Sequence, residues 1–480
     1  MSYKRNLTML TDFYEITMAN GYLETGMDDT IAYFDMFFRR IPDGGGYAIM
    51  AGLEQVIEYL KDLKFTDEDI EYLRSKNSFS EKFLKYLESF EFKCDVWAVP
   101  EGTPIFPGEP ILTVRGPVIQ AQFIETMILL IINHQSLIAT KASRIVRASE
   151  GRPVMEFGTR RAHSNSAAIY GARAAYIGGC AGTACVIADE DMEIPALGTM
   201  AHSWVQMFDD EYEAFKAYAK IYPDNCTLLV DTYNVLKSGV PAAIKVFDEV
   251  KPEKKGIRID SGDIAYLTKK ARAMLDEAGH SDCAIVVSNS LDEYLIRDIL
   301  HEGACIDSFG VGERLITART EPVFGGVYKL AAIEKEGRLV PKIKVSENVE
   351  KITNPGFKSL FRLFDRDTDE PLADLIALDG EVIPEDGEYE IFDPKATWKK
   401  KTVNNFYAVN LRKPVFVGGE CVYESPTIGE IREYCRRELD GLWAEMKRLE
   451  NPQTYYVDLS YELWKLKSDM LSNKTEIEYK

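Results

Sequence analysis

The chain has 480 residues, of which 46% are hydrophobic and 28% are charged, a composition typical of an ordinary globular protein with two or three domains. The formal net charge of −20 argues against a nucleic-acid-binding surface, because phosphate backbones require a basic face. An anionic ligand would therefore need a local cluster of Arg and Lys side chains.

The eight cysteines are scattered and form no C-x-x-C pair, so neither a structural zinc site nor a thioredoxin-type site is indicated. Free thiols of this kind are typical of a reducing compartment. Lys4 and Arg5 are not followed by an apolar segment, so we expect no signal peptide, and the longest apolar run, 127–132, is far shorter than a membrane span. These features predict a cytoplasmic protein that binds neither nucleic acid nor membranes.

The first 147 residues mix helical and extended patterns. Thr11 as a cap and Gly21 as a stop predict a helix over 11–20, and this helix carries Tyr14. Further along we expect a strand over 31–38, helices over 49–60 and 79–90, a small β-meander over 94–118 and a long helix over 120–147. The long helix is expected to lead into a second domain.

From residue 150 onward, short β-branched runs alternate with helical stretches. The runs cover 153–158, 193–198, 226–232, 256–263, 283–290, 305–312 and 327–333, with one more suggested within 176–186. This alternation is typical of βα units around a parallel sheet. The number of units, and the absence of a G-x-G-x-x-G sequence at the front, favour a barrel over a doubly wound sheet.

The alternation stops near residue 340. The segment 341–364 is expected to return to the first domain, and further polar β-like sequence follows it. The tail is predicted to be a helix that begins at a capping box formed by Thr427 and Glu430. We therefore expect an α/β protein with three regions: an N-terminal α/β sandwich domain (1–130, completed by part of 341–385), an irregular TIM-like α/β barrel with the active site (131–340), and a mostly helical C-terminal extension within 341–480.

Six of the predicted strands end in polar, small or charged residues. In a βα barrel these ends share one rim, where such enzymes keep their active sites. The side chains concerned include Arg160, Arg161, Thr199, His202, Asp231, Thr232, Arg258, Asp260, Ser261, Asp263, Ser288, Asn289 and Ser290, and the last strand end is the loop Gly310 to Arg314.

His202 is the most suggestive of these residues, because it alone among the five histidines follows an apolar run and a turn rich in small and hydroxyl residues. A hydrogen-bonded structural histidine is the alternative. Asp231 is expected to accept a hydrogen bond from His202 and so fix its tautomer.

The charged rim residues each have a functional and a structural interpretation, and the glycines have a functional one. Gly310 and Gly312 are expected to cradle a phosphate with the help of the next helix N-terminus. The rim arginines match carboxylates or phosphates, or else form salt bridges with the many acids. Asp260 and Asp263 could hold Mg²⁺ or ribose hydroxyls, or else cap helices.

Seven segments together resemble the nicotinate phosphoribosyltransferase family. They are LTDFYEITMA (10–19), EFGTRRA (156–162), GTMAHSW (198–204), VDTYNV (230–235), IRIDSGD (257–263), FGVGERL (309–315) and SENVEKITNPG (346–356). The resemblance implies an α/β sandwich beside an irregular, incomplete α/β barrel, and a homodimer in which the partner subunit seals the active site.

The resemblance also implies a reaction. Nicotinate and phosphoribosyl pyrophosphate would give nicotinate mononucleotide and pyrophosphate, in NAD biosynthesis, with help from ATP hydrolysis and Mg²⁺, as in a ligase-type enzyme. His202 matches the family's phosphorylated histidine and Asp231 the residue that orients it. Phe157 would stack on the pyridine ring, with Tyr14 supplied by the partner subunit.

The other implied roles concern substrate binding. Arg160, Thr199 and Arg258 would hold nicotinate and the ribose-phosphate groups. Gly310 and Gly312 would cradle the 5′-phosphate. The predicted substrate-binding set is completed by Asp260, Ser261 and Gly262, whereas no metal ligands are assigned.

Ala184 distinguishes nicotinate from nicotinamide as the substrate. The nicotinamide-using relatives have an aspartate where Ala184 stands. A carboxylate there would accept a hydrogen bond from an amide and repel the nicotinate carboxylate, so alanine favours nicotinate.

Two other functional classes remain open. A phosphate-binding barrel aldolase or isomerase would need a rim lysine or an acid/base pair, and no strand end before Gly310 supplies a lysine. If the chain were a nucleotide-sensing or scaffold protein, we would expect His202 or the IDSGD sequence to be lost, and both are present.

Overall fold

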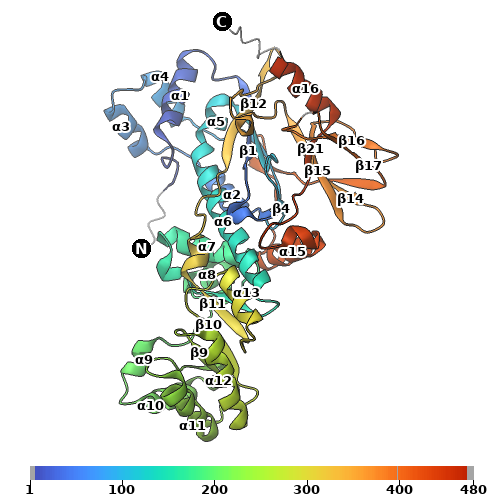
Figure 1. Cartoon of the computed structure of the whole chain (residues 1–480). Helices are drawn as coiled ribbons and strands as arrows, with labels where there is room; N and C mark the ends of the chain where they lie inside the picture. Colours follow the sequence, from blue (N-terminus) through green and yellow to red (C-terminus); the bar gives the residue numbers. More distant parts are fainter. Residues whose placement is uncertain (1–5, 397, 473–480) are drawn as a thin grey trace. The chain divides into compact units, whose positions relative to one another are not determined.

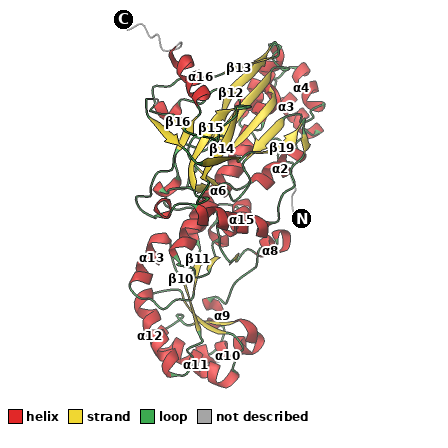
Figure 2. Cartoon of the chain, turned by 90° about the vertical axis from the view of Figure 1, so that its right-hand side faces the viewer, coloured by secondary structure: helices red, strands yellow, loops and turns green. Residues whose placement is uncertain are grey.

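The computed structural model describes residues 6–396 and 398–472, which form two compact units. Unit 1 combines the chain up to Ser136 with Val323–Thr427 and the chain from Glu433 onward. Unit 2 comprises Leu137–Pro322 and the short segment Ile428–Arg432. The chain is shown in two views in Figure 1 and Figure 2.

Unit 1 contains a seven-stranded sheet in the order β13-β12-β1-β5-β3-β19-β20. Its neighbouring strands pair antiparallel. The strands are β1 (Ile31–Phe37), β3 (Asp95–Ala98), β5 (Leu112–Pro117), β12 (Val327–Lys335), β13 (Arg338–Pro341), β19 (Lys413–Val417) and β20 (Glu420–Cys421). A separate pair joins β2 (Ala48–Ile49) to β4 (Pro104–Ile105).

The helices of the N-terminal part largely follow the sequence patterns. They are α1 (Phe13–Glu24), α2 (Leu53–Lys61), α3 (Asp67–Ser75), α4 (Glu81–Glu88) and α5 (Val118–Phe123), followed by the long α6 (Glu125–Ala148). Helix α3 was not predicted, although Thr66 and Asp69 form a complete capping box at its start. Val118–Ala148 is apolar and long enough to cross a membrane by composition alone, and 67% of its most apolar window is buried inside the protein. That burial accounts for its apolar character.

The prediction of a mostly helical C-terminal extension is wrong. Between residues 341 and 427 the described chain contains strands, loops and one short 3₁₀ turn (Val349–Lys351), and most of these strands lie in a second sheet of unit 1 with the order β17-β16-β21-β15-β14-β18. Its strands are β14 (Lys358–Asp365), β15 (Pro371–Leu378), β16 (Tyr389–Phe392), β17 (Lys400–Val403), β18 (Phe406–Asn410) and β21 (Val457–Leu459). Helices α15 (Ile428–Gly441) and α16 (Tyr461–Ser472) are the helical part of the tail.

The error has a physical cause. The sequence argument gave most weight to the tail helix predicted from the Thr427 and Glu430 capping box, whereas the buried positions of β14 and β15 are set by pairing between the two strands. Leu363, Ala373 and Leu375 then join a buried apolar cluster with side chains of β16, β17 and β18. Sheet contacts of this kind stabilise strands whose local pattern is weak.

Unit 2 is built on a six-stranded parallel sheet in the order β7-β6-β11-β10-β9-β8. Its strands are β6 (Val154–Glu156), β7 (Gly182–Thr183), β8 (Cys226–Leu229), β9 (Lys255–Ile259), β10 (Ala284–Ser288) and β11 (Ser308–Val311). The helices that connect them are α7 (Asn165–Ile177), α8 (Val186–Met192), α9 (His202–Gln206), α10 (Glu211–Ile221), α11 (Val240–Val250), α12 (Ile264–Glu277) and α13 (Glu293–His301), followed by α14 (Glu313–Ile316). Helices α10, α11 and α12 lie against β8, β9 and β10 (Figure 1).

The parallel sheet is a half-barrel rather than a closed barrel. Within residues 6–396 and 398–472, β7 and β8 are its two edges and no strand joins them. The predicted strand over 193–198 contributes a single bridge, between Ala196 and Thr183. The predicted strand over 327–333 is β12, which pairs antiparallel with β1 in unit 1. Local periodicity identified these segments as extended or apolar but carries no information about their partners.

Candidate active site

Part of the predicted rim of unit 2 comes together, near the carboxyl ends of the strands of the parallel sheet. Parallel strands place their carboxyl ends at one edge of a sheet, so residues far apart in the chain converge there. Thr199, His202, Asp231, Arg258 and Asp260 are joined by hydrogen bonds or by ion pairs within 4.0 Å.

His202 is the first residue of α9, and its side chain is 41% exposed. Its Nδ1 lies 3.1 Å from the hydroxyl oxygen of Thr232, within hydrogen-bond distance. Its Nε2 faces two carboxylates, 4.0 Å from Oδ1 of Asp231 and 3.9 Å from Oδ2 of Asp260. The hydrogen-bond partner of the ring is therefore Thr232, and Asp231 stands beyond hydrogen-bond distance on the opposite nitrogen.

The Asp231 side chain is almost completely buried, at 1% exposure. Its Oδ2 accepts hydrogen bonds from the backbone N–H of Asp260 (3.1 Å) and from the hydroxyl of Ser261 (2.6 Å). Its Oδ1, the atom that faces His202, is buried and has no hydrogen-bond partner among the residues that the structure describes. A buried carboxylate oxygen without a partner is costly, so this atom is suited to a cation or a proton donor that binds during function.

Arg258 on β9 organises the centre of the site. Its guanidinium donates to the hydroxyl of Ser288 (2.9 Å), to that of Thr199 (3.2 Å) and to Oδ1 of Asp260 (3.1 Å). The Ser288 hydroxyl in turn donates to the same Asp260 oxygen. The predicted alternative of a salt bridge is therefore present for Arg258, and it lies inside the site.

Phe157 follows β6 and lies between Arg258 and Gly310. The Arg258 guanidinium carbon is 5.6 Å from the centre of the phenyl ring, a cation–π arrangement. A Cβ added at Gly310 would lie 2.5 Å from a ring carbon of Phe157. Glycine at position 310 is thus required by the ring that packs on it, a reason that the sequence argument about phosphate did not include.

Several other predicted residues have more local roles. Asp263 is the N-cap of α12 and accepts a hydrogen bond from the N–H of Tyr266, as the capping alternative proposed. Gly262 has a φ of +84°, a conformation that other residues rarely adopt. Arg160 is exposed on the short 3₁₀ turn Thr159–Arg161.

Sequence reasoning assigned no role to four residues that the structure brings into this site. Thr232 contacts His202, Ser288 contacts Arg258, and Glu156 contacts Thr183 beside Phe157. Burial raises the pKa of the Glu156 carboxyl, opposed by hydrogen bonds from Thr183 and Gly158. Thr232 and Ser288 lie at predicted strand ends, so their positions in the sequence could have indicated a place in the site. Nothing in the sequence pattern indicated a role for the Glu156 and Thr183 side chains.

Tyr14 belongs to the other compact unit, on α1, where it is 44% exposed. Burial and the nearby Glu125 raise the pKa of its hydroxyl.

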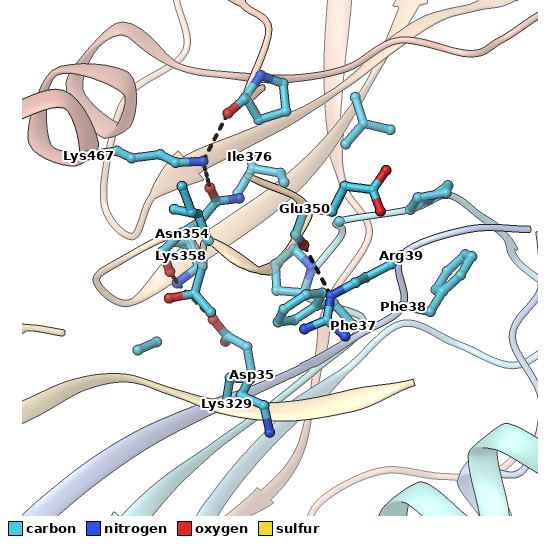
Figure 3. Close-up of a pocket in the computed structure, with 18 of the residues that line it drawn as sticks. Asp35, Phe37, Phe38, Arg39, Lys329, Glu350, Asn354, Lys358, Ile376 and Lys467 are labelled. Carbon is cyan, nitrogen blue, oxygen red and sulfur yellow. Dashed lines mark hydrogen bonds and ion pairs between the residues drawn. The ribbon is translucent and has the colours of Figure 1, made fainter. Parts of the chain in front are cut away.

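Unit 1 also has a cation-rich pocket (Figure 3). The SENVEKITNPG segment lines it, and Arg39 donates to the backbone oxygen of Glu350 at 3.1 Å. Lys467 donates to Oδ1 of Asn354 (2.8 Å) and to the oxygen of Pro394 (3.0 Å), and burial lowers the pKa of its amine to about 8. Lys358 forms a 2.7 Å ion pair with Asp35.

Three family models together cover most of the chain. Models described as nicotinate phosphoribosyltransferase N-terminal domain, family and C-terminal domain match residues 9–133, 153–362 and 357–467, respectively. A nicotinate phosphoribosyltransferase of Bacillus subtilis is 45% identical over 98% of this chain and 97% of its own length. The chain belongs to the nicotinate phosphoribosyltransferase family.

More distant members give the same picture. A nicotinate phosphoribosyltransferase of Homo sapiens is 30% identical over 97% of both chains. The crystal structure of the human nicotinic acid phosphoribosyltransferase superposes with a TM-score of 0.84 at 28% identity, covering 96% of this chain and 99% of that one. A Pyrococcus furiosus nicotinate-nucleotide pyrophosphorylase shares the fold, with a TM-score of 0.69 at 24% identity over 91% of this chain and 96% of that one.

The family implies a magnesium ion, and the site fits one in part. Within the described residues, no group of three or more His, Cys, Asp or Glu side chains is arranged to hold a metal ion. Proteins often bind Mg²⁺ through only one or two carboxylates, with substrate phosphates and water as the other ligands. The unpartnered Oδ1 of Asp231 and the nearby carboxylate of Asp260 match that requirement.

Proposed function

We propose that this protein transfers the phosphoribosyl group of phosphoribosyl pyrophosphate to nicotinate, in NAD biosynthesis, with assistance from ATP hydrolysis through a phosphohistidine at residue 202. One observation carries the proposal: within a member of this family, the matching strand-end residues converge on one exposed histidine whose Nε2 faces two carboxylates.

The nucleophile is the Nε2 atom of His202. With the ring proton on Nδ1 donated to the Thr232 hydroxyl, Nε2 keeps its lone pair. This lone pair attacks the γ-phosphorus of ATP, the bond to the β–γ bridging oxygen breaks, and ADP leaves with the electron pair. The N–P bond is later hydrolysed, which returns His202 and releases phosphate.

The phosphoribosyl transfer forms one bond and breaks another. The pyridine nitrogen of nicotinate bonds to C1 of the ribose, while the bond from C1 to pyrophosphate breaks and the leaving group takes the electron pair. Positive charge develops on the ribose ring and negative charge on the leaving pyrophosphate, so fixed anions beside the ring and cations beside the leaving group lower the barrier. Asp231 and Asp260 supply the negative charge near His202, and Arg258 supplies a cation.

Bound Mg²⁺ would be held by Asp231 and Asp260 and would neutralise phosphate charge. The residues around these carboxylates hold them in place: Ser261 donates to Asp231, and Arg258 donates to Asp260.

The base is expected to lie against Phe157, with its carboxylate held by arginine. Phe157 presents its ring beside the Arg258 guanidinium, and Arg160 is exposed on the adjacent turn. Ala184, also exposed, carries no charge that would repel a carboxylate. Gly310, in β11, and Gly312, the N-cap of α14, are proposed to border the 5′-phosphate.

The proposal includes a cytoplasmic homodimer, in which Tyr14 completes the active site of the partner subunit. Exposed apolar side chains on and before α1 support an interface there: Leu7, Leu10, Phe13, Tyr14 and Met18. All eight cysteines are free thiols, in keeping with the reducing compartment that the sequence predicts.

Incubation with γ-labelled ATP tests the phosphohistidine. The wild type is expected to acquire acid-labile label and His202→Ala none. The hydrogen bond to Thr232 contributes about 0.5–1.5 kcal/mol, so Thr232→Val is expected to lower the labelling rate by about 2- to 10-fold, while Thr232→Ser should retain most of it. Equal labelling of the wild type and His202→Ala would remove the role of His202.

A turnover assay tests the substrate. Nicotinate, nicotinamide and quinolinate are compared with phosphoribosyl pyrophosphate, each with and without ATP. Nicotinate is expected to react fastest, and ATP to increase its rate. Preference for another base, or an ATP-independent rate, would contradict the corresponding part of the proposal.

A further inference from the structure

Glu156, the last residue of β6, lies between the two loops that flank the proposed position of the base. Strand β6 pairs with β11 on one side and with β7 on the other. The chain after β6 runs into Phe157 and Gly158, and the chain after β7 runs into Ala184 and Cys185. The Glu156 side chain is 0% exposed, so substrate and solvent do not reach it.

The two carboxylate oxygens of Glu156 are divided between these loops. Oε1 accepts a hydrogen bond from the backbone N–H of Gly158. Oε2 accepts one from the Thr183 hydroxyl at 2.6 Å. The Thr183 oxygen in turn accepts one from the N–H of Cys185 at 3.0 Å. A continuous series of hydrogen bonds therefore joins the Phe157–Gly158 turn to the segment that carries Ala184.

Backbone contacts support the same connection. The N–H of Ala184 donates to the backbone oxygen of Glu156 at 2.8 Å, and the N–H of Phe157 donates to Val311 at 2.8 Å. A Cβ at Gly158 would lie 2.7 Å from Oε1 of Glu156 and 2.6 Å from Ile316, so only glycine lets this turn pack so closely on the carboxylate. Glu156 is thus hydrogen-bonded to both loops, through its side chain and its backbone.

Packing alone does not account for a carboxylate at this position. Among the described residues, no lysine or arginine forms an ion pair with Glu156, and its side-chain partners are two neutral donors. A buried charge without a cation is costly. Glutamine has the same shape without the charge, but its NH₂ group would face one of the two donors. The position requires two acceptors at once, which a carboxylate supplies.

We infer that Glu156 and Thr183 form a positioning pair that couples the Phe157 turn to the Ala184 loop and so sets the affinity and selectivity for the pyridine base. The inference rests on the proposed function, because it places the base between Phe157 and Ala184. Neither residue of the pair touches the substrate.

Paired substitutions of Thr183 test the inference. Thr183→Val keeps the shape and removes the hydroxyl, and we expect the KM for nicotinate to rise about tenfold while the KM for phosphoribosyl pyrophosphate stays within twofold. Thr183→Ser restores the hydroxyl and is expected to recover most of the affinity. Glu156→Gln is expected to resemble Thr183→Val, and the double variant to be no worse than either single one, because all three break the same connection.

Glu293→Gln is the matched control. Glu293 is also a glutamate of unit 2 with 0% exposure, but it is paired with Lys141 and Arg144. This variant is expected to lower the Tm without changing the ratio of the two KM values. Equal nicotinate KM values for Thr183→Val and Thr183→Ser, or a parallel rise in both KM values, would overturn the inference.

Amide hydrogen exchange tests the coupling without turnover. Thr183→Val is expected to speed exchange of the Gly158 N–H at least fivefold relative to Thr183→Ser, although Gly158 contacts the carboxylate and not Thr183. Unchanged exchange at Gly158 would overturn the coupling. Coupled exchange in a protein that does not convert nicotinate would instead refute the proposed function and leave the positioning pair in place.

Discussion

Gly310→Ala is the substitution that best separates two roles for the glycine at the end of β11. The sequence predicts that Gly310 opens a phosphate loop, whereas the structure shows the Phe157 ring packed on its Cα. A Cβ at this position would lie 2.5 Å and 2.7 Å from two ring carbons of Phe157, and 3.4 Å from the Cβ of Ser288. Carbon atoms normally approach to about 3.5–4.0 Å, so the ring must move by about 1 Å.

The expected effect is a loss of base affinity. Stacking between two aromatic rings contributes about 0.5–1.5 kcal/mol and depends on ring offset, so displacing Phe157 should raise the KM for nicotinate by about 2- to 10-fold. Overpacking is also expected to cost about 1–3 kcal/mol of folding stability. If Gly310 acts mainly on phosphate, the same substitution should instead raise the KM for phosphoribosyl pyrophosphate.

Steady-state kinetics with each substrate varied in turn decides between the two roles. Phe157→Ala supplies the control, because in that background the added methyl group meets no ring and should change the nicotinate KM little further. A raised KM for phosphoribosyl pyrophosphate with an unchanged KM for nicotinate would refute the packing argument.

Three further predictions follow from other parts of the chain. Ala184→Asp should shift the kcat/KM preference from nicotinate toward nicotinamide by at least tenfold, and an unchanged preference would remove the selectivity argument. Burial raises the pKa of Glu15 from 4.5 to about 7, so between these values the folded chain holds a proton that the unfolded chain has released. Wild-type stability should therefore fall relative to Glu15→Gln as pH rises from about 4.5 to 7, and then stay level; parallel Tm curves would contradict this. Arg362, 1% exposed, pairs with the fully buried Asp374 at 2.7 Å, so Arg362→Met should cost about 3–5 kcal/mol in urea unfolding, whereas Arg74→Met, at a solvent-accessible pair with Glu71, should cost much less; equal losses would refute the distinction.

The contacts of His202 illustrate how far sequence reasoning reaches within the site. Its position after an apolar run, in a turn rich in small and hydroxyl residues, singled it out, and Asp231 was named as its partner because it follows a neighbouring predicted strand. The predicted hydrogen bond to Asp231 was placed by strand adjacency alone. In the structure the hydrogen-bond partner of the ring is Thr232, 3.1 Å from Nδ1, while Asp231 lies 4.0 Å from Nε2.

Strand identity was predicted more reliably than strand pairing. The segments at 153–158, 226–232, 256–263, 283–290 and 305–312 all contribute strands to the parallel sheet. The segment at 327–333 is equally extended, yet its partner is β1 in the other unit. The hydrophobic pattern of a strand indicates which of its side chains are buried. It does not identify the neighbouring strand, because many strands have similar patterns.

The sequence by itself determined the family, the parallel strands of unit 2 and the polar residues at their ends, because parallel strands deliver their carboxyl ends to one edge wherever they pair. Only the tertiary structure decided that Gly310 makes room for Phe157, that Thr232 holds His202, and that Glu156 joins two loops. The two residues of each of these contacts are between 27 and 153 positions apart in the chain. No local sequence pattern encodes a distance of a few ångströms between such residues.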